Sequence, residues 1–202
     1  MGIVKKIIDF VMDILETIAF VGSIFIAIYL FIMQPNQVKG ASMVPTFSTG
    51  DYIFTSKITY KIRSIQRGDV VVFKEPKRSE IEYIKRVIGL PGDQVMVRSG
   101  IVYLNNVPLQ ENYINLSTPL QPFGFLQEGI PVVVPPDHIF VMGDNREVSS
   151  DSREFGPIRI SSLIGQVFYR YFPFNKVGTL TNPLPRMLRT KSQLYYLFAL
   201  RS

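Results

Sequence analysis

The chain has 202 residues, a formal net charge of +6 and no cysteine. This length fits one domain, and the lack of cysteine excludes a disulfide framework, a cysteine nucleophile and thiolate metal sites. The basic residues are scattered along the chain, whereas a nucleic-acid-binding protein would cluster them or interleave them with stacking aromatics. The positive charge suits contact with anionic lipid headgroups beside a membrane anchor.

The first 35 residues predict a membrane anchor preceded by an amphipathic lead-in. Residues 1–16 place five charged side chains at helical spacing among aliphatic ones, which is typical of an interfacial helix. Residues 17–33 carry no charge, and as a helix they would extend roughly 26 Å, near the short limit for a membrane span. We therefore expect a lead-in over 1–16 and a transmembrane anchor over 17–35.

Two further features bear on the fate and direction of this anchor. A cleavable signal peptide has a shorter apolar core that ends in a small-x-small site. Here the apolar run ends in Gln34, Pro35, Asn36 and Gln37 instead, which favours a retained anchor. The lysines at positions 5 and 6 predict a cytoplasmic N-terminus, so that the rest of the chain lies on the outer (trans) side of the membrane.

Residues 36–175 predict a mainly β domain, a barrel or an orthogonal sandwich. Short runs rich in Val, Ile, Tyr and Phe alternate with Gly, Pro, Asn or Asp, and no helical periodicity interrupts them. The segment 106–130 has little strand signal and is interpreted as an insertion, and 176–202 as a C-terminal tail too short in apolar residues to span a membrane. The predicted strands are 52–56, 70–74, 81–88, 94–98, 101–104, 131–134, 139–142 and 163–171.

Ser42 is a candidate nucleophile, because it lies between small residues and a turn containing Pro45. A serine hydroxyl needs a base. The single histidine, His138, has Asp137 beside it, but neighbours on a strand point to opposite faces, so a structural role is favoured. Lys85 is the alternative base, if burial lowers its pKa from about 10.4 by several units. The competing interpretation is a solvated lysine on a strand edge.

Strand alternation places Lys85 and Arg86 on opposite faces, so that one can be buried while the other is solvated. A dense polar loop follows the predicted strand 139–142 and runs from 143 to 153. Ion pairs of Asp151 with Arg153, or of Asp144 with Arg146, could lock it, and a serine within it could hydrogen-bond a lysine. A plain polar turn is the alternative; a calcium loop is excluded because its ligand spacing is not met.

Four motifs together resemble those of type I signal (leader) peptidases, which are membrane-anchored Ser/Lys proteases. They occur in that family's order, after an N-terminal apolar segment, and extend over residues 36–170. The motifs are Gly-Ala-Ser-Met-Val-Pro-Thr at 40–46, Arg-Gly-Asp-Val-Val-Val-Phe at 67–73, Tyr-Ile-Lys-Arg-Val-Ile-Gly-Leu-Pro-Gly-Asp at 83–93, and Gly-Asp-Asn-Arg at 143–146 with the residues up to 153.

The resemblance implies a role for five residues. Ser42 would be the nucleophile and Lys85 the general base, a variant of triad logic. Ser149 would orient the lysine, and Asp151 would pair with Arg153 to hold the polar loop. The backbone N–H of Ser42 would meet the oxyanion.

The resemblance also implies a substrate, an exported preprotein bound in extended form against an open sheet edge. Small residues at the first and third positions before the cut would enter shallow apolar pockets, for which Met43, Val72, Tyr83 and Ile84 are the matching candidates. In many members a serine two residues before the nucleophile adds a hydroxyl donor, but here that residue is Gly40. Losing such a donor can cost about two orders of magnitude in rate, so a substitute is expected.

The predicted protein is thus a single-pass enzyme of a plasma (inner) or thylakoid-type membrane that removes signal peptides. No cofactor, metal or nucleic acid is expected. Two alternatives stay open from the sequence: a related Ser/Lys processing protease with other substrates, and an anchored, non-catalytic β domain that scaffolds partners at the membrane. The intact set of Ser42, Lys85 and Ser149 argues against the scaffold.

Overall fold

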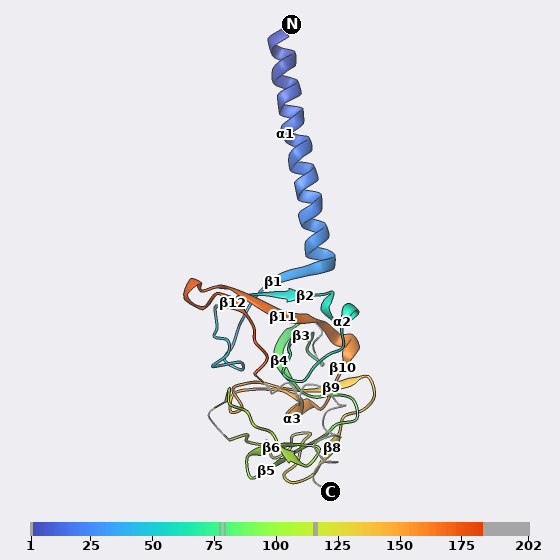
Figure 1. Ribbon diagram of the computed structural model, residues 1–202, viewed down its shortest axis with the longest axis vertical. Helices are drawn as coiled ribbons and strands as arrows, with labels where there is room; N and C mark the ends of the chain where they lie inside the picture. The colour runs from blue at the N-terminus through green and yellow to red at the C-terminus, as the bar shows by residue number, and fades with distance from the viewer. Residues whose placement is uncertain (1, 77, 79, 115–116, 184–202) are drawn as a thin grey trace.

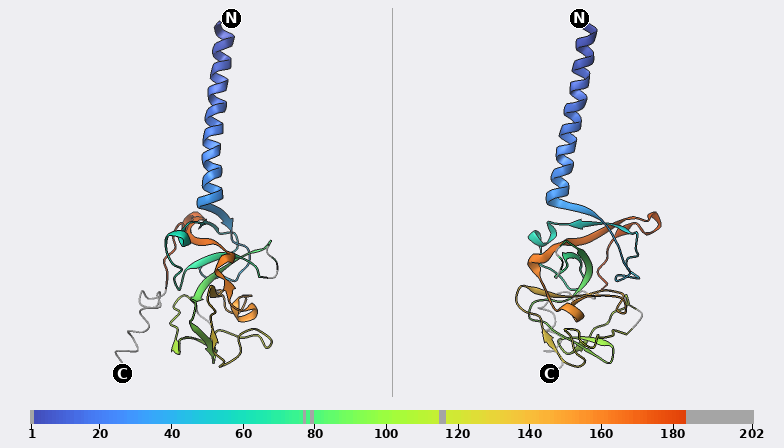
Figure 2. Two further views of the ribbon diagram at one scale, coloured as in Figure 1. Left: turned by 90° about the vertical axis from the view of Figure 1, so that its right-hand side faces the viewer. Right: turned by 180° about the vertical axis from the view of Figure 1, so that it is seen from behind.

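The computed structural model describes residues 2–76, 78, 80–114 and 117–183, and consists of one long helix and a β domain (Figure 1). Helix α1 (Gly2–Ala27) continues into a π-helical turn, η1 (Ile28–Ile32). Its 31 residues are long and apolar enough to cross a membrane, and none of them is buried against the β domain. The predicted lead-in and the apolar segment form one continuous helix, which projects from the domain in every view (Figure 2).

The helix ends at Ile32 and strand β1 (Met33–Gln37) begins at the next residue. This strand was not among the predicted ones, and its first residues fall within the predicted anchor range 17–35. Its polar sequence hides it, but it pairs antiparallel with β2 (Tyr52–Ser56) along its full length. Because β1 lies at the edge of its sheet, it tolerates Pro35, which lacks a backbone N–H.

The large sheet is antiparallel and has the strand order β1-β2-β11-β3-β4-β9-β10, with β12 paired to β11. β12 falls inside the predicted tail, so the first residues of that segment extend the sheet; residues 184–202 lie outside the described residues. The remaining strands of this sheet are β3 (Val70–Lys74), β4 (Glu82–Gly89), β9 (His138–Met142), β10 (Ile158–Arg159), β11 (Leu163–Phe172) and β12 (Gly178–Thr179).

The small sheet has the order β7-β6-β5-β8 and lies at the end of the domain farthest from α1 (Figure 1). Tight hairpins join β5 to β6 and β6 to β7. Ser99 and Gly100 have positive φ, as do Asn105 and Asn106, which is the geometry that two-residue hairpin loops require. Its strands are β5 (Gln94–Arg98), β6 (Ile101–Leu104), β7 (Val107–Pro108) and β8 (Val132–Val133).

The described part of the domain contains four single helical turns, where the sequence predicted none: α2 (Thr59–Ile62), α3 (Ser152–Phe155), η2 (Ile160–Ser162) and η3 (Phe174–Lys176). Turns this short leave no periodic pattern in a sequence. The predicted insertion is packed rather than loose, because Leu109 and Leu126 are buried in the apolar cluster beneath the small sheet. A second cluster includes Met43 and Phe47, and it supports the turn that carries Ser42.

Candidate active site

Ser42 begins a tight turn that is fixed from both sides. The turn is closed by the N–H of Phe47, which donates to the carbonyl of Met43 at 2.8 Å, and both of these side chains are buried. On the other side, the N–H of Asn145 donates to the Ser42 carbonyl at 3.0 Å. A Cβ at Gly143 would lie 2.5 Å from that carbonyl, so only glycine fits there. The polar loop therefore packs directly on the Ser42 backbone.

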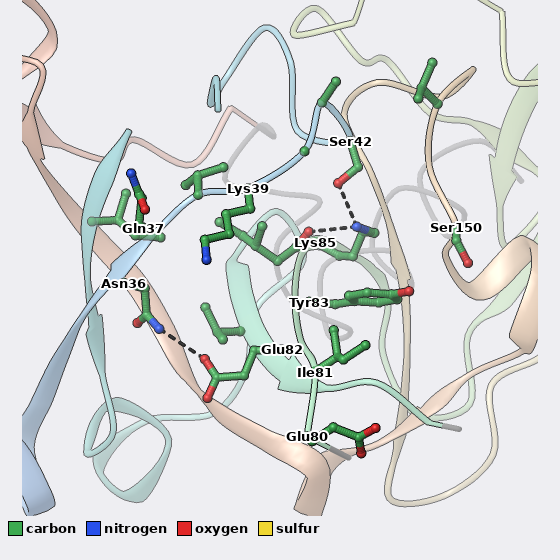
Figure 3. Close-up of a pocket in the computed structure, with 17 residues that line it drawn as sticks. Asn36, Gln37, Lys39, Ser42, Glu80, Ile81, Glu82, Tyr83, Lys85 and Ser150 are labelled. Atoms are coloured by element: carbon green, nitrogen blue, oxygen red, sulfur yellow. Dashed lines mark hydrogen bonds between the residues drawn. The ribbon is translucent and has the colours of Figure 1, made fainter. Parts of the chain in front are cut away.

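Lys85 lies beside Ser42, as the sequence predicted for a base and nucleophile. Its Nζ is 2.8 Å from the Ser42 Oγ and 3.1 Å from the carbonyl oxygen of Ile84 (Figure 3). The lysine comes from β4, and only 3% of it is exposed because its side chain points into the domain beside Ser42. The alternative of a solvated lysine on a strand edge is wrong. The amine also lies 5.0 Å from the centre of the Tyr83 ring.

Burial lowers the pKa of Lys85 from 10.5 to about 8. The negative charges of Asp151 and Asp144 oppose this shift, and the positive charge of Arg153 adds to it. Among the described residues, no carboxylate forms a salt bridge with the amine. A substantial fraction of Lys85 is therefore neutral near physiological pH, which a general base requires.

Arg86 points away from Lys85, but it is not solvated: only 2% of it is exposed. The expectation that only one of these two residues is buried is wrong, because Arg86 has a buried partner. Its Nε and Nη2 donate to the two carboxylate oxygens of Asp144 at 2.8 and 2.6 Å, and its Nη1 donates to the Gly68 carbonyl. Burial alone would lower the pKa of Arg86, but Asp144 raises it above the ordinary value.

The predicted ion pair between Asp151 and Arg153 is present and buried. The Nε and Nη2 of Arg153 donate to the Asp151 carboxylate at 2.9 and 2.8 Å, and the N–H of Gly143 donates to it at 3.0 Å. Burial would raise the pKa of Asp151, but these hydrogen bonds outweigh it and hold the pKa below its ordinary value. Asp151 thus stays anionic and fixes the start and end of the polar loop.

The alternative pairing of Asp144 with Arg146 does not form. Asp144 belongs to Arg86, and Arg146 instead reaches the predicted insertion, where it pairs with Glu111 and donates to the Thr118 hydroxyl at 2.8 Å. The Nε of Arg146 also donates to the Gly143 carbonyl at 2.9 Å. The insertion is therefore hydrogen-bonded to the loop that packs on Ser42, a contact between segments too far apart along the chain to be predicted from their sequence.

Ser149 lies within this loop but does not hydrogen-bond the lysine amine as expected. Its Oγ is buried and makes no hydrogen bond of regular geometry among the residues that the structure describes, but it is close enough to the Asp151 carboxylate to help lower the pKa of that group. A Cβ at Gly143 would lie 2.2 Å from this oxygen, so the hydroxyl is packed against the loop backbone. The predicted hydrogen bond to Lys85 is absent here.

A cleft of about 640 Å³ opens beside the Ser42–Lys85 pair (Figure 3). One wall is formed by residues 36–42 and the other by residues 80–85. Val72, Tyr83 and Ile84 line it as predicted, whereas Met43 does not, because it is buried in the core with 1% exposed. At the end away from Ser42, the Asn36 amide donates to the Glu82 carboxylate at 3.1 Å (Figure 3).

The wall from β4 has a free hydrogen-bonding edge. β4 pairs with β3 from Glu82 to Arg86, but β9 pairs with it only from Arg86 onward. Residues 82–85 can therefore accept an extended peptide on the side of the cleft.

The Ser42 N–H donates to no atom within the described part of the chain.

His138 does not line this cleft, and its Nδ1 lies 2.8 Å from the Pro136 carbonyl oxygen. This agrees with the structural role expected for it. In the described ranges, no group of three His, Cys, Asp or Glu side chains is placed to hold a metal ion.

Residues 11–172 match the protein family described as "Signal peptidase, peptidase S26". The chain is 39% identical to the probable signal peptidase I-2 of Synechocystis sp. over 166 residues. This alignment covers 80% of this chain and 73% of that protein. It is 34% identical over 185 residues to signal peptidase IB of Staphylococcus aureus, covering 85% and 96%. A crystal structure of a signal peptidase I from Enterococcus faecalis V583 aligns with a TM-score of 0.43 at 34% identity, covering 52% of this chain and 97% of that one.

Proposed function

The chain belongs to the S26 family of signal peptidases, and we propose that Ser42 and Lys85 carry out its reaction, hydrolysis of the bond that joins a signal peptide to an exported preprotein. One observation supports this assignment above all others: a buried amine with a lowered pKa lies 2.8 Å from a serine hydroxyl at the head of an open cleft. A serine and a nearby base are the minimum set for acyl transfer.

In the first step, neutral Lys85 accepts the proton of the Ser42 hydroxyl while the Oγ attacks the scissile carbonyl carbon. The N–H of Ser42, which has no partner in the described structure, is available to the developing oxyanion. Gly40 has no side chain and so adds no second donor. The C–N bond then breaks, and the leaving amine takes the proton from the Lys85 ammonium.

At the start of the second step, the carbonyl carbon of the signal peptide is bound to the Ser42 Oγ as an ester, and Lys85 is neutral again. Lys85 accepts a proton from a water molecule, whose oxygen attacks the ester carbonyl. The C–O bond to Ser42 breaks, and the serine regains its proton from Lys85. The net reaction consumes one water and restores both side chains. Asp151 and Arg153 are assigned to hold the loop. Ser149 is assigned to orient the lysine, which requires a change of its side-chain rotamer because its hydroxyl does not bond the Lys85 amine in this structure.

Specificity is assigned to the cleft wall that β4 provides. A signal peptide in extended form would pair with the free edge of residues 82–85, so that its carbonyl carbon at the cut lies over Ser42. Val72, Tyr83 and Ile84 would then limit the size of side chains just before the cut. We also propose that α1 spans the membrane with Lys5 and Lys6 on the cytoplasmic side and the β domain on the outer side.

The test is cleavage of a labelled preprotein by the full-length enzyme in detergent. Ser42→Ala should abolish cleavage, whereas Ser48→Ala, a serine just beyond the same turn with no side-chain hydrogen bond in the described structure, should leave it unchanged. The ester of the signal peptide should be detected on Ser42 after acid quench. Normal cleavage by the Ser42→Ala variant would remove this assignment and favour a non-catalytic scaffold role for the β domain.

A further inference from the structure

The joint between the membrane helix and the β domain contains no linker. Helix η1 ends at Ile32, Met33 is already extended with φ −153° and ψ 154°, and β1 pairs with β2 from its first residue. The end of this strand and the residues that follow it, 36–42, form one wall of the cleft. The angle at this joint therefore sets how the cleft is oriented toward the bilayer.

The end of the helix leaves carbonyl groups without helical donors. The N–H of Met33 donates to the carbonyl of Ile28, and there the helical bonding stops. A helix terminus leaves its last carbonyls unpaired, here those of Tyr29, Leu30, Phe31 and Ile32. Near the apolar part of a membrane, unpaired backbone groups are costly because no water is present to bond them.

Lys57 supplies hydrogen bonds to three of these four carbonyls. Its backbone N–H donates to Ile32 at 2.8 Å, and its Nζ lies 3.1 Å from the Tyr29 carbonyl oxygen and 3.4 Å from that of Leu30. The amine also lies 5.4 Å from the centre of the Tyr29 ring, within range of a cation–π contact. A positive charge at a helix C-terminus is stabilised further by the helix dipole.

Among the residues that the structure describes, no other makes such a connection. Within the described ranges, apart from the β1–β2 ladder, all hydrogen bonds that join residues 2–32 to the β domain come from Lys57. Lys57 directly follows β2, the strand that pairs with β1, so its backbone position is fixed by the sheet. Its long apolar stem also suits a position at the boundary between lipid and water.

We propose that Lys57 is a positioning residue that fixes the angle between the membrane helix and the β domain, and so aligns the cleft with a signal peptide that arrives from the bilayer. The proposal rests on the proposed function for its consequence in catalysis, but not for its structural part. Lys57 acts through the joint and touches neither Ser42 nor Lys85.

The structural part is tested by a distance measurement in lipid vesicles. The chain has no cysteine, so spin labels on Gly22→Cys in α1 and Phe123→Cys, a fully exposed residue, report on the joint alone. The distance distribution should be narrow in the parent and in Lys57→Arg, which keeps the donors, and clearly broader in Lys57→Ala. Lys61→Ala, an exposed lysine of α2, is the matched control and should stay narrow. An unchanged width in Lys57→Ala would overturn the proposal.

The catalytic part is tested with two substrates on the same vesicles. Lys57→Ala should cleave a membrane-inserted preprotein about tenfold less efficiently, because small misplacements of a substrate are costly. It should cleave a short soluble peptide as fast as the parent, and Lys57→Arg should restore the preprotein rate. An equal loss on both substrates would show a general structural role and contradict the proposal. If the parent enzyme cleaves neither substrate, the proposed function fails, and the distance measurement still decides the role of Lys57.

Discussion

The two faces of strand β4 each carry a buried basic residue, and the pKa values of these two residues shift in opposite directions. Lys85 and Arg86 are adjacent, and each is at most 3% exposed. Arg86 faces the Asp144 carboxylate, makes two short hydrogen bonds to it and has a raised pKa. Lys85 faces a serine hydroxyl and a backbone carbonyl, has no salt bridge in the described structure and has a lowered pKa.

The difference shows that burial alone does not decide whether a cation stays charged. Removal from water disfavours the charge of both residues, and a hydrogen-bonded carboxylate outweighs that cost for Arg86 only. Asp151 and Asp144 are close enough to act on Lys85 through their charge, but Asp151 is bonded to Arg153 and Asp144 to Arg86. The ion pairs around the cleft thus leave Lys85 as the buried amine able to lose its proton.

The largest expected effect comes from removing the unpaired amine. Lys85→Met should lower kcat roughly 10⁶-fold, since nucleophile and base act as a unit. Lys85→Arg should be equally inactive because a guanidinium does not give up its proton in proteins. Lys74→Met, an exposed lysine at the end of β3, should cleave a peptide substrate as the parent does. A Lys85→Met variant with near-parental kcat would contradict the assignment of Lys85 as the general base.

The same substitution should not destabilise the fold. Because the folded-state pKa of Lys85, about 8, lies below the unfolded value of 10.5, the unfolded chain holds the proton more tightly. The charged lysine therefore destabilises the folded state by its full amount below pH 8, and this destabilisation disappears as the pH rises toward 10.5. The free energy of unfolding of Lys85→Met should exceed that of the parent by up to about 3 kcal/mol at pH 7, measured by denaturant unfolding.

The next largest effect is expected on the opposite face. Arg86→Met should lower the free energy of unfolding by about 3–5 kcal/mol, because it leaves the Asp144 carboxylate buried without its partner. The measurement is denaturant unfolding of the full chain in detergent. The double variant Arg86→Met with Asp144→Leu should recover much of the loss. If Arg86→Met were as stable as the parent, the ion pair with Asp144 would not be what keeps Arg86 charged in the core.

A smaller effect should follow from the charge of Asp151. Asp151→Asn removes a negative charge that raises the pKa of Lys85 and leaves Arg153, whose charge lowers it, without its partner. The loss of the Asp151 charge lowers the pKa of Lys85, while the charge of Arg153 is the same in both proteins, so the acid limb of the activity profile should move to lower pH. The exposed Glu147→Gln is the control and should leave the limb in place. A limb that moves to higher pH would contradict the electrostatic account.

The sequence predicted the parts of this molecule that depend on local pattern. Short apolar runs between turn residues predicted the major strands closely, and the hairpin at Ser99 and Gly100 follows from the residues that tolerate positive φ. Strand β1 was missed because its sequence is polar and contains Pro35. Its pairing with β2 becomes visible only once the long-range contacts are known.

The candidate site divides in the same way. The motifs indicated Ser42 and Lys85, and alternation along β4 correctly separated Lys85 from Arg86. The partners of Arg86 and Arg146 come from distant segments, so no spacing in the sequence could predict Asp144 or Glu111 for them. Met43 was expected in the cleft, but the turn after Ser42 rotates it into the core.

The central claim is that a buried, unpaired Lys85 amine activates Ser42, and the pH dependence of kcat/KM tests it most directly, because this constant reports the ionisation of the free enzyme. With a soluble peptide substrate, kcat/KM should rise about tenfold per pH unit on the acid side and level off above an apparent pKa of about 8. A rate that stays flat from well below pH 8 upward would contradict the account. So would a midpoint near the ordinary histidine value of about 6.5 that disappears in His138→Gln.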